Sequence, residues 1–457
     1  HRRLEEFRPI RPSHIGLYTC GPTVYLPLTL GNWRAFVFDD VLKRSLRSLG
    51  YEVRHVMNVT DVGHLVGDGD AGEDKVERTA LREGKTAWDI AKRYEGQFRE
   101  GMLALHVGRD TEDAGMIMPR ATEHVPQQIA VIEALERKGF TYRISDGVYF
   151  DTSKFPAYGA LSGQKLEEKE AGARVEVNEE KRHPSDFALW KFSPVSVLKR
   201  DMEWSSPWGV GFPGWHIECS AMAREYLGQP FDIHCGGVDH IAVHHENEIA
   251  QSEAAFGVPL ANYWLHNEFL LVDGGRMGKS LGNAYTLEDV QAHGFDPIDF
   301  RYFCLGAHYR SKLNFTWEGL EGAHSAMQKL RRRVSELEKG ASEPDAMTME
   351  TFRAALEDDL AMPKALAIMW DMLSREDVLS ASKRATLFGM DEVFGLGMKE
   401  WSTQVEEVPA DILAMQRERE EARRAKLWQK SDELRDALHA RGWLVEDTTD
   451  GSSLRKA

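Results

Sequence analysis

The sequence has 457 residues, of which 42% are hydrophobic and 28% are charged, an ordinary composition for a globular protein with room for about three domains. Its formal net charge of −16 argues against a protein that coats nucleic acid nonspecifically, because such binding depends on neutralising phosphates. The sequence contains no apolar run of about 18 residues and no apolar signal core, so we expect no membrane span and a cytoplasmic location.

The cysteines are too few for a disulfide framework in so long a chain, which fits a reducing compartment. They are Cys20, Cys219, Cys235 and Cys304. No two of them form a CxxC pair, so a zinc ribbon has no support, and any metal site must combine distant segments.

The first 62 residues predict the opening of a parallel α/β sheet. Residues 14–25 begin with a strand pattern and run into a Gly-Pro turn, and residues 32–50 have helical periodicity that ends at Gly50. Residues 51–62 have the pattern of a second strand. The order strand, loop, helix, strand is typical of such a sheet.

The middle of the chain, roughly 109–203, predicts an insertion into this sheet. It combines a helical segment at 127–140 with a short strand at 146–151 and a charged stretch at 164–184, which we expect to be a solvated loop or hairpin. From about residue 204 the α/β pattern resumes, and after residue 310 it becomes almost wholly helical. The last 50 residues predict a small charged module.

Residues 244–248, with the sequence HHENE, place two histidines and two glutamates within one segment. The surrounding helix formers, and the absence of Gly and Pro, favour a helix on which His244 and Glu248 lie one turn apart on one face. These two side chains could hold one metal ion. The alternative is a set of solvated polar residues on a surface helix, and their spacing does not decide between the two.

Two glycine-rich segments are candidates for phosphate or nucleotide binding. Residues 273–283 follow an apolar strand and resemble a phosphate loop with Lys279 as its positive charge, but Asp273 stands where a Walker A loop needs glycine. This disfavours a P-loop NTPase, and the absence of G-x-G-x-x-G disfavours a dehydrogenase. Gly236 and Gly237 end another apolar strand, where Asp239 could bind ribose hydroxyls. Simple tight turns are the alternative in both places.

Seven segments, in this order, resemble the cysteinyl-tRNA synthetase family, from about residue 14 to the end of the chain. They are CGPTVYLPLTLGN, PRATEHVPQQIAVIEALERKG, DFALWK, GFPGWHIECSAM, FDIHCGGVDHIAVHHENEIAQSEA, RMGKSLGN and DDLAMPKALAIMWD. The resemblance implies an α/β fold with a Rossmann-type parallel-sheet catalytic domain split by a connective insertion. The expected domains are the catalytic halves 1–108 and 204–265, the insertion 109–203, a KMSKS-type loop and linking region 266–310, a helical domain 311–405 and an anticodon-binding module 406–457.

The family binds one zinc ion per chain, and the resemblance maps its ligands onto Cys20, Cys219, His244 and Glu248. A soft thiolate binds zinc far better than a hydroxyl does, so the resemblance implies a zinc ion that selects cysteine and rejects serine without editing. A closed structural site is the alternative, because four protein ligands usually indicate one. In addition, Thr60 and Trp215 match positions that line the cysteine pocket.

The two class I signatures appear in altered form, as Thr29-Leu30-Gly31-Asn32 and Arg276-Met277-Gly278-Lys279-Ser280. The resemblance implies that ATP with Mg²⁺ binds Thr29, Gly31, Asn32, Gly236, Gly237, Asp239, Arg276, Met277, Lys279 and Ser280. Of these, Lys279, Thr29 and Asn32 are the candidate catalytic residues. Loss of the first histidine of the HIGH signature removes a possible cationic donor, but Thr29 can still donate a neutral hydrogen bond.

The resemblance therefore implies a cysteine–tRNA ligase, a monomer that forms cysteinyl-adenylate and pyrophosphate from L-cysteine and ATP and then charges tRNA(Cys). In the tail, the candidate anticodon contacts are Arg423, Trp428, Asp432 and Asp447; ordinary ion pairs on an amphipathic helix are their alternative. Two other functions stay open. One is a mycothiol-pathway cysteine ligase, which is expected to lack the anticodon module, and the other is a noncatalytic RNA-binding paralogue.

Overall fold

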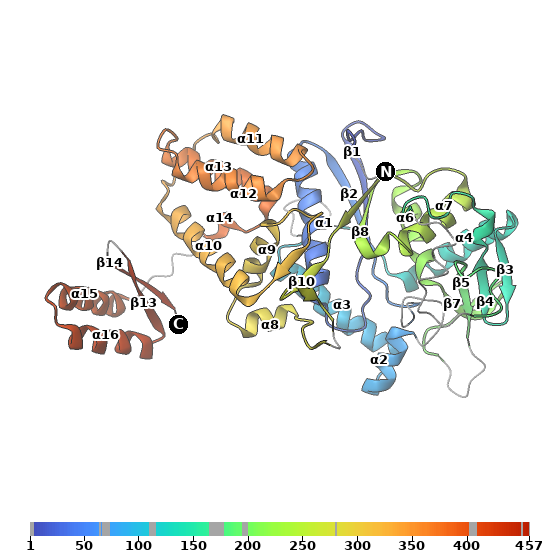
Figure 1. Cartoon of the computed structure of the whole chain (residues 1–457), viewed down its shortest axis with the longest axis horizontal. Helices are drawn as coiled ribbons and strands as arrows, with labels where there is room; N and C mark the ends of the chain where they lie inside the picture. Colours follow the sequence, from blue (N-terminus) through green and yellow to red (C-terminus); the bar gives the residue numbers. More distant parts are fainter. Residues whose placement is uncertain are drawn as a thin grey trace. The chain divides into compact units, whose positions relative to one another are not determined.

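The computed structural model describes residues 4–63, 65, 74–108, 116–163, 178–193, 200–278, 281–401, 409–448 and 451–456. The chain divides into two compact units, His1–Met398 and Lys399–Ala457, whose elements are labelled in Figure 1. No helix among these residues is long and apolar enough to cross a membrane.

A four-stranded parallel sheet forms the centre of the first unit. Its order is β2 (Glu52–Met57), β1 (His14–Thr19), β8 (Phe231–Gly237) and β9 (Ala261–Asn267). Beyond β2, single parallel bridges join Val56 to Ile117 and Val59 to Arg120. The chain thus winds outwards from β1 in one direction and from β8 in the other, which confirms the split doubly wound sheet. Ligands bind such sheets where the winding reverses, at the carboxyl ends of β1 and β8.

Helices α1 (Leu30–Ser48) and α6 (Trp215–Leu227) cover opposite faces of this sheet (Figure 1). Neighbouring residues of β1 point to opposite faces, as the pleat requires. Tyr18 packs with Cys219 and Met222 of α6, whereas Thr19 bonds Asp39 of α1. Helices α4 (Val125–Arg137) and α7 (His244–Phe256) pack beside α6.

The insertion contains a five-stranded antiparallel sheet. Its order is β3 (Thr141–Ile144), β4 (Gly147–Phe150), β5 (Phe187–Phe192), β7 (Gly209–Pro213) and β6 (Trp204–Ser206). Because β6 and β7 complete it, this sheet reaches Pro213, beyond residue 203, where the sequence pattern places the end of the insertion. A strand pattern alone does not reveal which sheet receives the strand. Most of the charged stretch, residues 164–177, lies outside the described residues.

A third sheet contains β10 (Leu270–Val272), β11 (Gly275–Arg276) and β12 (Leu313–Phe315). Strands β10 and β11 form a hairpin whose two turn residues, Asp273 and Gly274, have φ values of +49° and +76°. Two consecutive positive φ values are typical of a type I′ hairpin turn, and Asp-Gly favours it. The start of the glycine-rich segment is therefore a hairpin turn and not a phosphate loop between strand and helix.

The first unit is mainly helical after residue 310, as the sequence predicts. Its further helices among the described residues are α2 (Lys75–Glu83), α3 (Ala87–Ala104), α8 (Leu287–Ala292), α9 (Pro297–Leu305), α10 (Trp317–Glu336), α11 (Ala346–Glu357), α12 (Met362–Ser374) and α13 (Ser380–Phe394). The short α14 (Met398–Trp401) begins at the last residue of this unit. Short 3₁₀ turns cover Ala121–His124, Thr152–Lys154 and Val238–His240. The fully buried Arg301 of α9 donates to Asp40 of α1 and to the carbonyls of Leu105 and Phe394. This side chain joins the helical region to α1, which packs on the parallel sheet.

The second unit consists of α15 (Ala410–Arg424), α16 (Trp428–Ala440) and a hairpin of β13 (Trp443–Thr448) and β14 (Gly451–Lys456). Ile412, Leu438 and Trp443 form its small core. The partly buried Met415, Val445 and Leu454 pack against this core.

Candidate functional site

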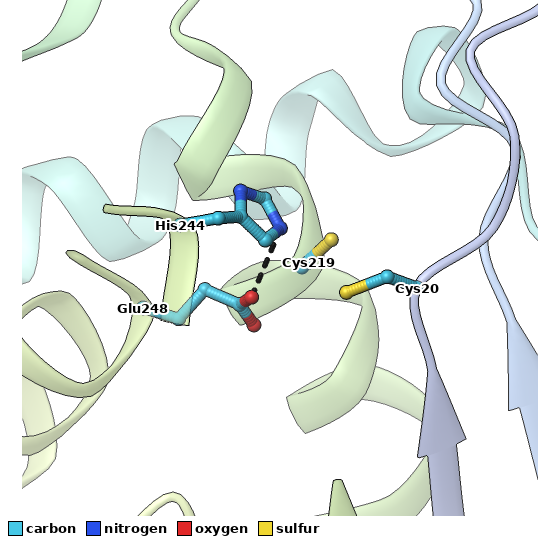
Figure 2. A group of neighbouring side chains, drawn as sticks. All are labelled: Cys20, Cys219, His244 and Glu248. Carbon is cyan, nitrogen blue, oxygen red and sulfur yellow. Dashed lines mark ion pairs between the residues drawn. The ribbon is translucent and has the colours of Figure 1, made fainter. Parts of the chain in front are cut away.

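Four predicted ligand side chains converge at the carboxyl end of β1 (Figure 2). Cys20 directly follows β1, Cys219 comes from α6, and His244 and Glu248 come from the start of α7. The candidate ligand atoms all lie within 4.8 Å of one another. Cys20 is partly exposed, whereas Cys219, His244 and Glu248 are buried. The surface-helix alternative for residues 244–248 is therefore wrong.

The arrangement fits a zinc ion. His244 Nε2 lies 3.0 Å from Glu248 Oε1, yet this buried oxygen has no hydrogen-bond partner of suitable geometry among the described residues. A buried carboxylate oxygen without a partner is costly, and a cation would relieve that cost. Two sulfurs, one imidazole nitrogen and one carboxylate oxygen form a donor set that zinc accepts in tetrahedral geometry.

The charges of this group also suit a cation. Although burial opposes it, the hydrogen bond from Cys20 lowers the pKa of Cys219 to about 6, so a thiolate is accessible at neutral pH. Burial and the same hydrogen bond raise the pKa of Cys20. Against the effect of burial, His234 and His244 lower the pKa of Glu248, which is therefore ionised.

Several histidines around this group were not predicted from the sequence. His234 Nε2 lies 2.8 Å from Glu248 Oε2, and His245 Nε2 lies 3.4 Å from Cys20 Sγ, so that Cys20, His234, His245 and Glu248 form a second possible donor group. The unpredicted His216 lies on α6, and its Nδ1 is 2.9 Å from His244 Nδ1.

Position along the strands could have revealed part of this cluster. His266 lies near the carboxyl end of the parallel strand β9, where ligands bind, whereas His234 lies midway along β8. His266 Nε2 is 2.8 Å from His245 Nδ1, which orients the other ring nitrogen of His245 towards Cys20.

Of the two predicted cysteine-pocket residues, Trp215 contacts a ligand side chain and Thr60 contacts the neighbour of another. The ring of Trp215 stacks on His244 with centroids 4.4 Å apart. Buried Thr60 donates to Glu218 Oε2 at 2.9 Å and accepts from Asn58 Nδ2 at 3.0 Å. Glu218 directly precedes the candidate ligand Cys219 in α6, so Thr60 is hydrogen-bonded to the neighbour of a ligand.

The two class I signatures come together at the start of α1. Asn32 Oδ1 accepts the backbone N–H and the hydroxyl of Thr29, at 3.0 and 2.9 Å. Met277 Sδ lies 3.6 Å from the position that a Cβ on Gly31 would occupy, and Leu30 N donates to Tyr285 O at 2.8 Å. Arg276 is exposed beside Met277. The predicted Lys279 and Ser280 lie outside the described residues.

Gly236 and Gly237 lie at the carboxyl end of β8, next to the point where the winding reverses. A Cβ on Gly236 would lie 2.7 Å from His240 Nδ1 and 2.8 Å from His245, so only glycine fits there. The exposed Asp239 follows in a short 3₁₀ turn. These residues thus lie at the carboxyl end of a parallel strand, where ligands of such sheets bind.

In the second unit, two candidate anticodon residues flank the turn between its helices. Arg423 lies in the last turn of α15, and Trp428 begins α16 with 58% of its surface exposed. Asp432 lies one turn after Trp428 and pairs with Arg435 at 3.2 Å, as the ion-pair alternative predicts. Asp447 lies in β13, and its side chain lies outside the described part of the chain.

Two family models match the chain. Residues 6–325 match the model described as tRNA synthetases class I (C) catalytic domain, and residues 405–455 match the cysteinyl-tRNA ligase anticodon binding domain. The second match overlaps the charged module predicted at the end of the sequence.

Curated relatives match over nearly their full length. The chain is 49% identical over 454 residues to Cysteine–tRNA ligase 1 of Burkholderia lata, covering 99% of this chain and 95% of the relative. It is 43% identical over 478 residues to Cysteine–tRNA ligase of Thermus thermophilus, covering 99% and 97%.

Solved structures share the fold at low sequence identity. Methionyl-tRNA synthetase from Mycobacterium tuberculosis bound by methionyl-adenylate is 16% identical, with a TM-score of 0.53 and coverage of 88% of this chain and 94% of that chain. A LeuRS–tRNA–LeuAMS ternary complex from Agrobacterium radiobacter is 11% identical, with a TM-score of 0.58 and coverage of 87% and 85%.

Proposed function

The chain belongs to the cysteine–tRNA ligase family of class I aminoacyl-tRNA synthetases, and from this premise we propose that it joins L-cysteine to tRNA(Cys) at the expense of ATP. The observation that carries the choice of amino acid is the convergence of Cys20, Cys219, His244 and Glu248. We also propose the domain division that the sequence predicts, with the insertion extended to Pro213, where its sheet ends.

One zinc ion held by Cys20, Cys219, His244 and Glu248 would supply a soft Lewis acid that accepts a thiolate far better than a hydroxyl. The residues around this group prepare the site. The Nδ1 contact with His216 leaves His244 Nε2 directed at Glu248, and the Trp215 ring covers His244. A site built to bind one polar group of its substrate can reject an analogue that lacks this group by a factor of about 10⁴ to 10⁵ without editing.

Adenylate formation needs no covalent enzyme nucleophile, because the carboxylate of cysteine attacks the α-phosphorus of ATP in line. Positioning and charge stabilisation supply the catalysis. Because Asn32 Oδ1 accepts hydrogen bonds from Thr29, its Nδ2 can donate to a phosphate oxygen beside the N-terminus of α1. Lys279 supplies the positive charge, with Mg²⁺ on the ATP phosphates, and Gly236, Gly237 and Asp239 accept the nucleoside.

The second unit distinguishes tRNA from a small amine as the cysteine acceptor. A mycothiol-pathway ligase joins cysteine to an amino sugar and needs no anticodon-binding domain, whereas residues 405–455 match one. We propose that Trp428 stacks on an anticodon base while Arg423, Asp432 and Asp447 bind base edges or phosphate. The exposure of Trp428 supports this role.

The experiment that tests this function is ATP–pyrophosphate exchange with zinc-loaded protein, comparing cysteine with serine, followed by charging of tRNA(Cys). Exchange with cysteine alone and a charged tRNA are expected. No exchange from folded, zinc-loaded protein that still binds tRNA(Cys) would favour the noncatalytic RNA-binding paralogue. Exchange without charging of tRNA would favour the small-amine ligase.

A further inference from the structure

The first turns of α7 carry two sets of side chains with different partners. His244 and Glu248 belong to the ligand group, whereas Glu246, between them in sequence, contacts the insertion. Its Oε1 accepts the backbone N–H of Ser162 at 2.6 Å, and its Oε2 accepts that of Gly159 at 3.0 Å. Glu246 is only 1% exposed, so this carboxylate is a buried contact between the insertion and the helix of the ligands.

Asn247 adds a second contact to the same turn of the insertion. Its Oδ1 accepts the hydroxyl of buried Tyr158 at 2.5 Å, and Tyr158 packs in a core with Phe187 of β5. Ser162 Oγ closes the turn by donating to Gly159 O at 3.2 Å. Residues 158–162 are thus bound both to α7 and to the sheet of the insertion.

The N-cap of α7 gives this turn no side-chain hydrogen bond. Its N-cap residue, Val243, makes no side-chain capping hydrogen bond, whereas Ser, Thr, Asp or Asn would normally do so. Glu246 forms no ion pair with any described residue, so backbone N–H groups and the helix N-terminus stabilise its charge. His216 and His234 contact the two ligand side chains directly, and the insertion adds the contacts that hold the backbone of the turn that carries them.

We propose that Glu246 is a positioning residue for the metal site. By holding Gly159 and Ser162 against α7, it sets the approach of His244 and Glu248 to a shared ion, and it thereby makes metal affinity and thiol selection depend on the insertion. The part of this inference that concerns thiol selection rests on the proposed function. The part that concerns metal affinity does not.

The test compares Glu246→Gln with the matched control Glu253→Gln in the full chain. Glu253 lies two turns further along α7, is half-buried and also accepts a backbone N–H, that of Leu260. The amide in Glu246→Gln turns one acceptor oxygen into a donor that faces a backbone N–H. Zinc affinity, measured by competition with a chromophoric chelator, should fall about 10-fold or more, as for residues that orient ligands from behind.

Further readouts separate positioning from loss of stability. The absorption of bound Co²⁺ should shift in Glu246→Gln and not in Glu253→Gln, because d–d bands report ligand geometry. The KM for cysteine in pyrophosphate exchange should rise more than kcat falls. Parental zinc affinity and an unchanged cobalt spectrum in folded Glu246→Gln would overturn the proposal, whatever its melting temperature.

Tyr158→Phe keeps the proposal testable if Glu246→Gln does not fold. It removes only the hydroxyl that reaches Asn247, and zinc affinity should fall about threefold; parental affinity would overturn the inference in that case. Zinc affinity is measured without substrates, so the comparison decides the role of Glu246 even if the parent shows no exchange. Absence of exchange in the parent would refute only the proposed function.

Discussion

Asn in place of Asp40 should destabilise the first unit more than any surface change, because it leaves a buried arginine without its counter-charge. Asp40 is 2% exposed and Arg301 is 0% exposed. Asp40 Oδ2 accepts Arg301 Nη2 at 2.6 Å and Arg44 Nε at 2.7 Å, and Oδ1 accepts Gly108 N at 2.9 Å. These contacts join α1, whose N-cap is Thr29 and whose first turn carries Asn32, to the helical region.

The magnitude follows from the pKa of Asp40 and from the burial of its partner. Burial alone would raise the pKa, yet Arg301 and Arg44 lower it from 3.8 to about 2. At about 1.4 kcal/mol per pH unit, the ionised carboxylate contributes about 2 kcal/mol above pH 4, and this is lost as the pH falls towards 2. Asp40→Asn removes that contribution and leaves the buried Arg301 charge without a counter-charge. We therefore expect the free energy of unfolding to fall by about 3 to 5 kcal/mol.

The assay is urea unfolding followed by tryptophan fluorescence at pH 7, with Asp391→Asn as control. The buried Asp391 carboxylate accepts the backbone N–H groups of Leu396 at 2.7 Å and Met398 at 2.6 Å. It also attracts Arg301, but Arg301 keeps its direct partner Asp40 when Asp391 is replaced. The control should cost about 1 to 2 kcal/mol. A loss below 1 kcal/mol for Asp40→Asn, or one no larger than that of the control, would refute the reasoning.

Three further predictions concern the proposed function. Cys219→Ser replaces a soft donor by a hard one and should lower zinc affinity by more than about 100-fold in chelator competition; parental affinity would exclude Cys219 as a ligand. Thr29→Ala frees Asn32 from its hydroxyl contact and should slow single-turnover adenylate formation about tenfold with little change in the KM for cysteine. An unchanged rate would contradict that role. Trp428→Ala should lower kcat/KM for tRNA charging about 5- to 100-fold, equivalent to about 1 to 3 kcal/mol of stacking, while pyrophosphate exchange stays at the parental rate. An equal loss in both assays would mean that Trp428 acts on stability instead.

The sequence by itself determined the elements whose patterns are local. The strand-helix-strand opening, the helix that begins at His244 and the helical region after residue 310 follow from hydrophobic periodicity and from helix formers, which depend on near neighbours in the chain. The resemblance to a known family pointed to Cys20, Cys219, His244 and Glu248 together, and the structure brings all four into one group. No spacing rule could have joined positions so far apart.

Only the tertiary structure decided which residues share a sheet, a core or a site. Strands β6 and β7 have ordinary strand patterns, but the pairing of β7 with β5 and of β6 with β7 places both in the antiparallel sheet and not in the parallel one. Glutamate usually lies on the surface, and the hydrogen bonds from the backbone N–H groups of Gly159 and Ser162 offset the energetic cost of burying Glu246. His216 and His234 matter because the fold brings α6 and β8 beside α7. The physical reason is the same in each case: strand pairing, burial and buried hydrogen bonds depend on partners that are distant in the sequence, and the chain must fold before those partners meet.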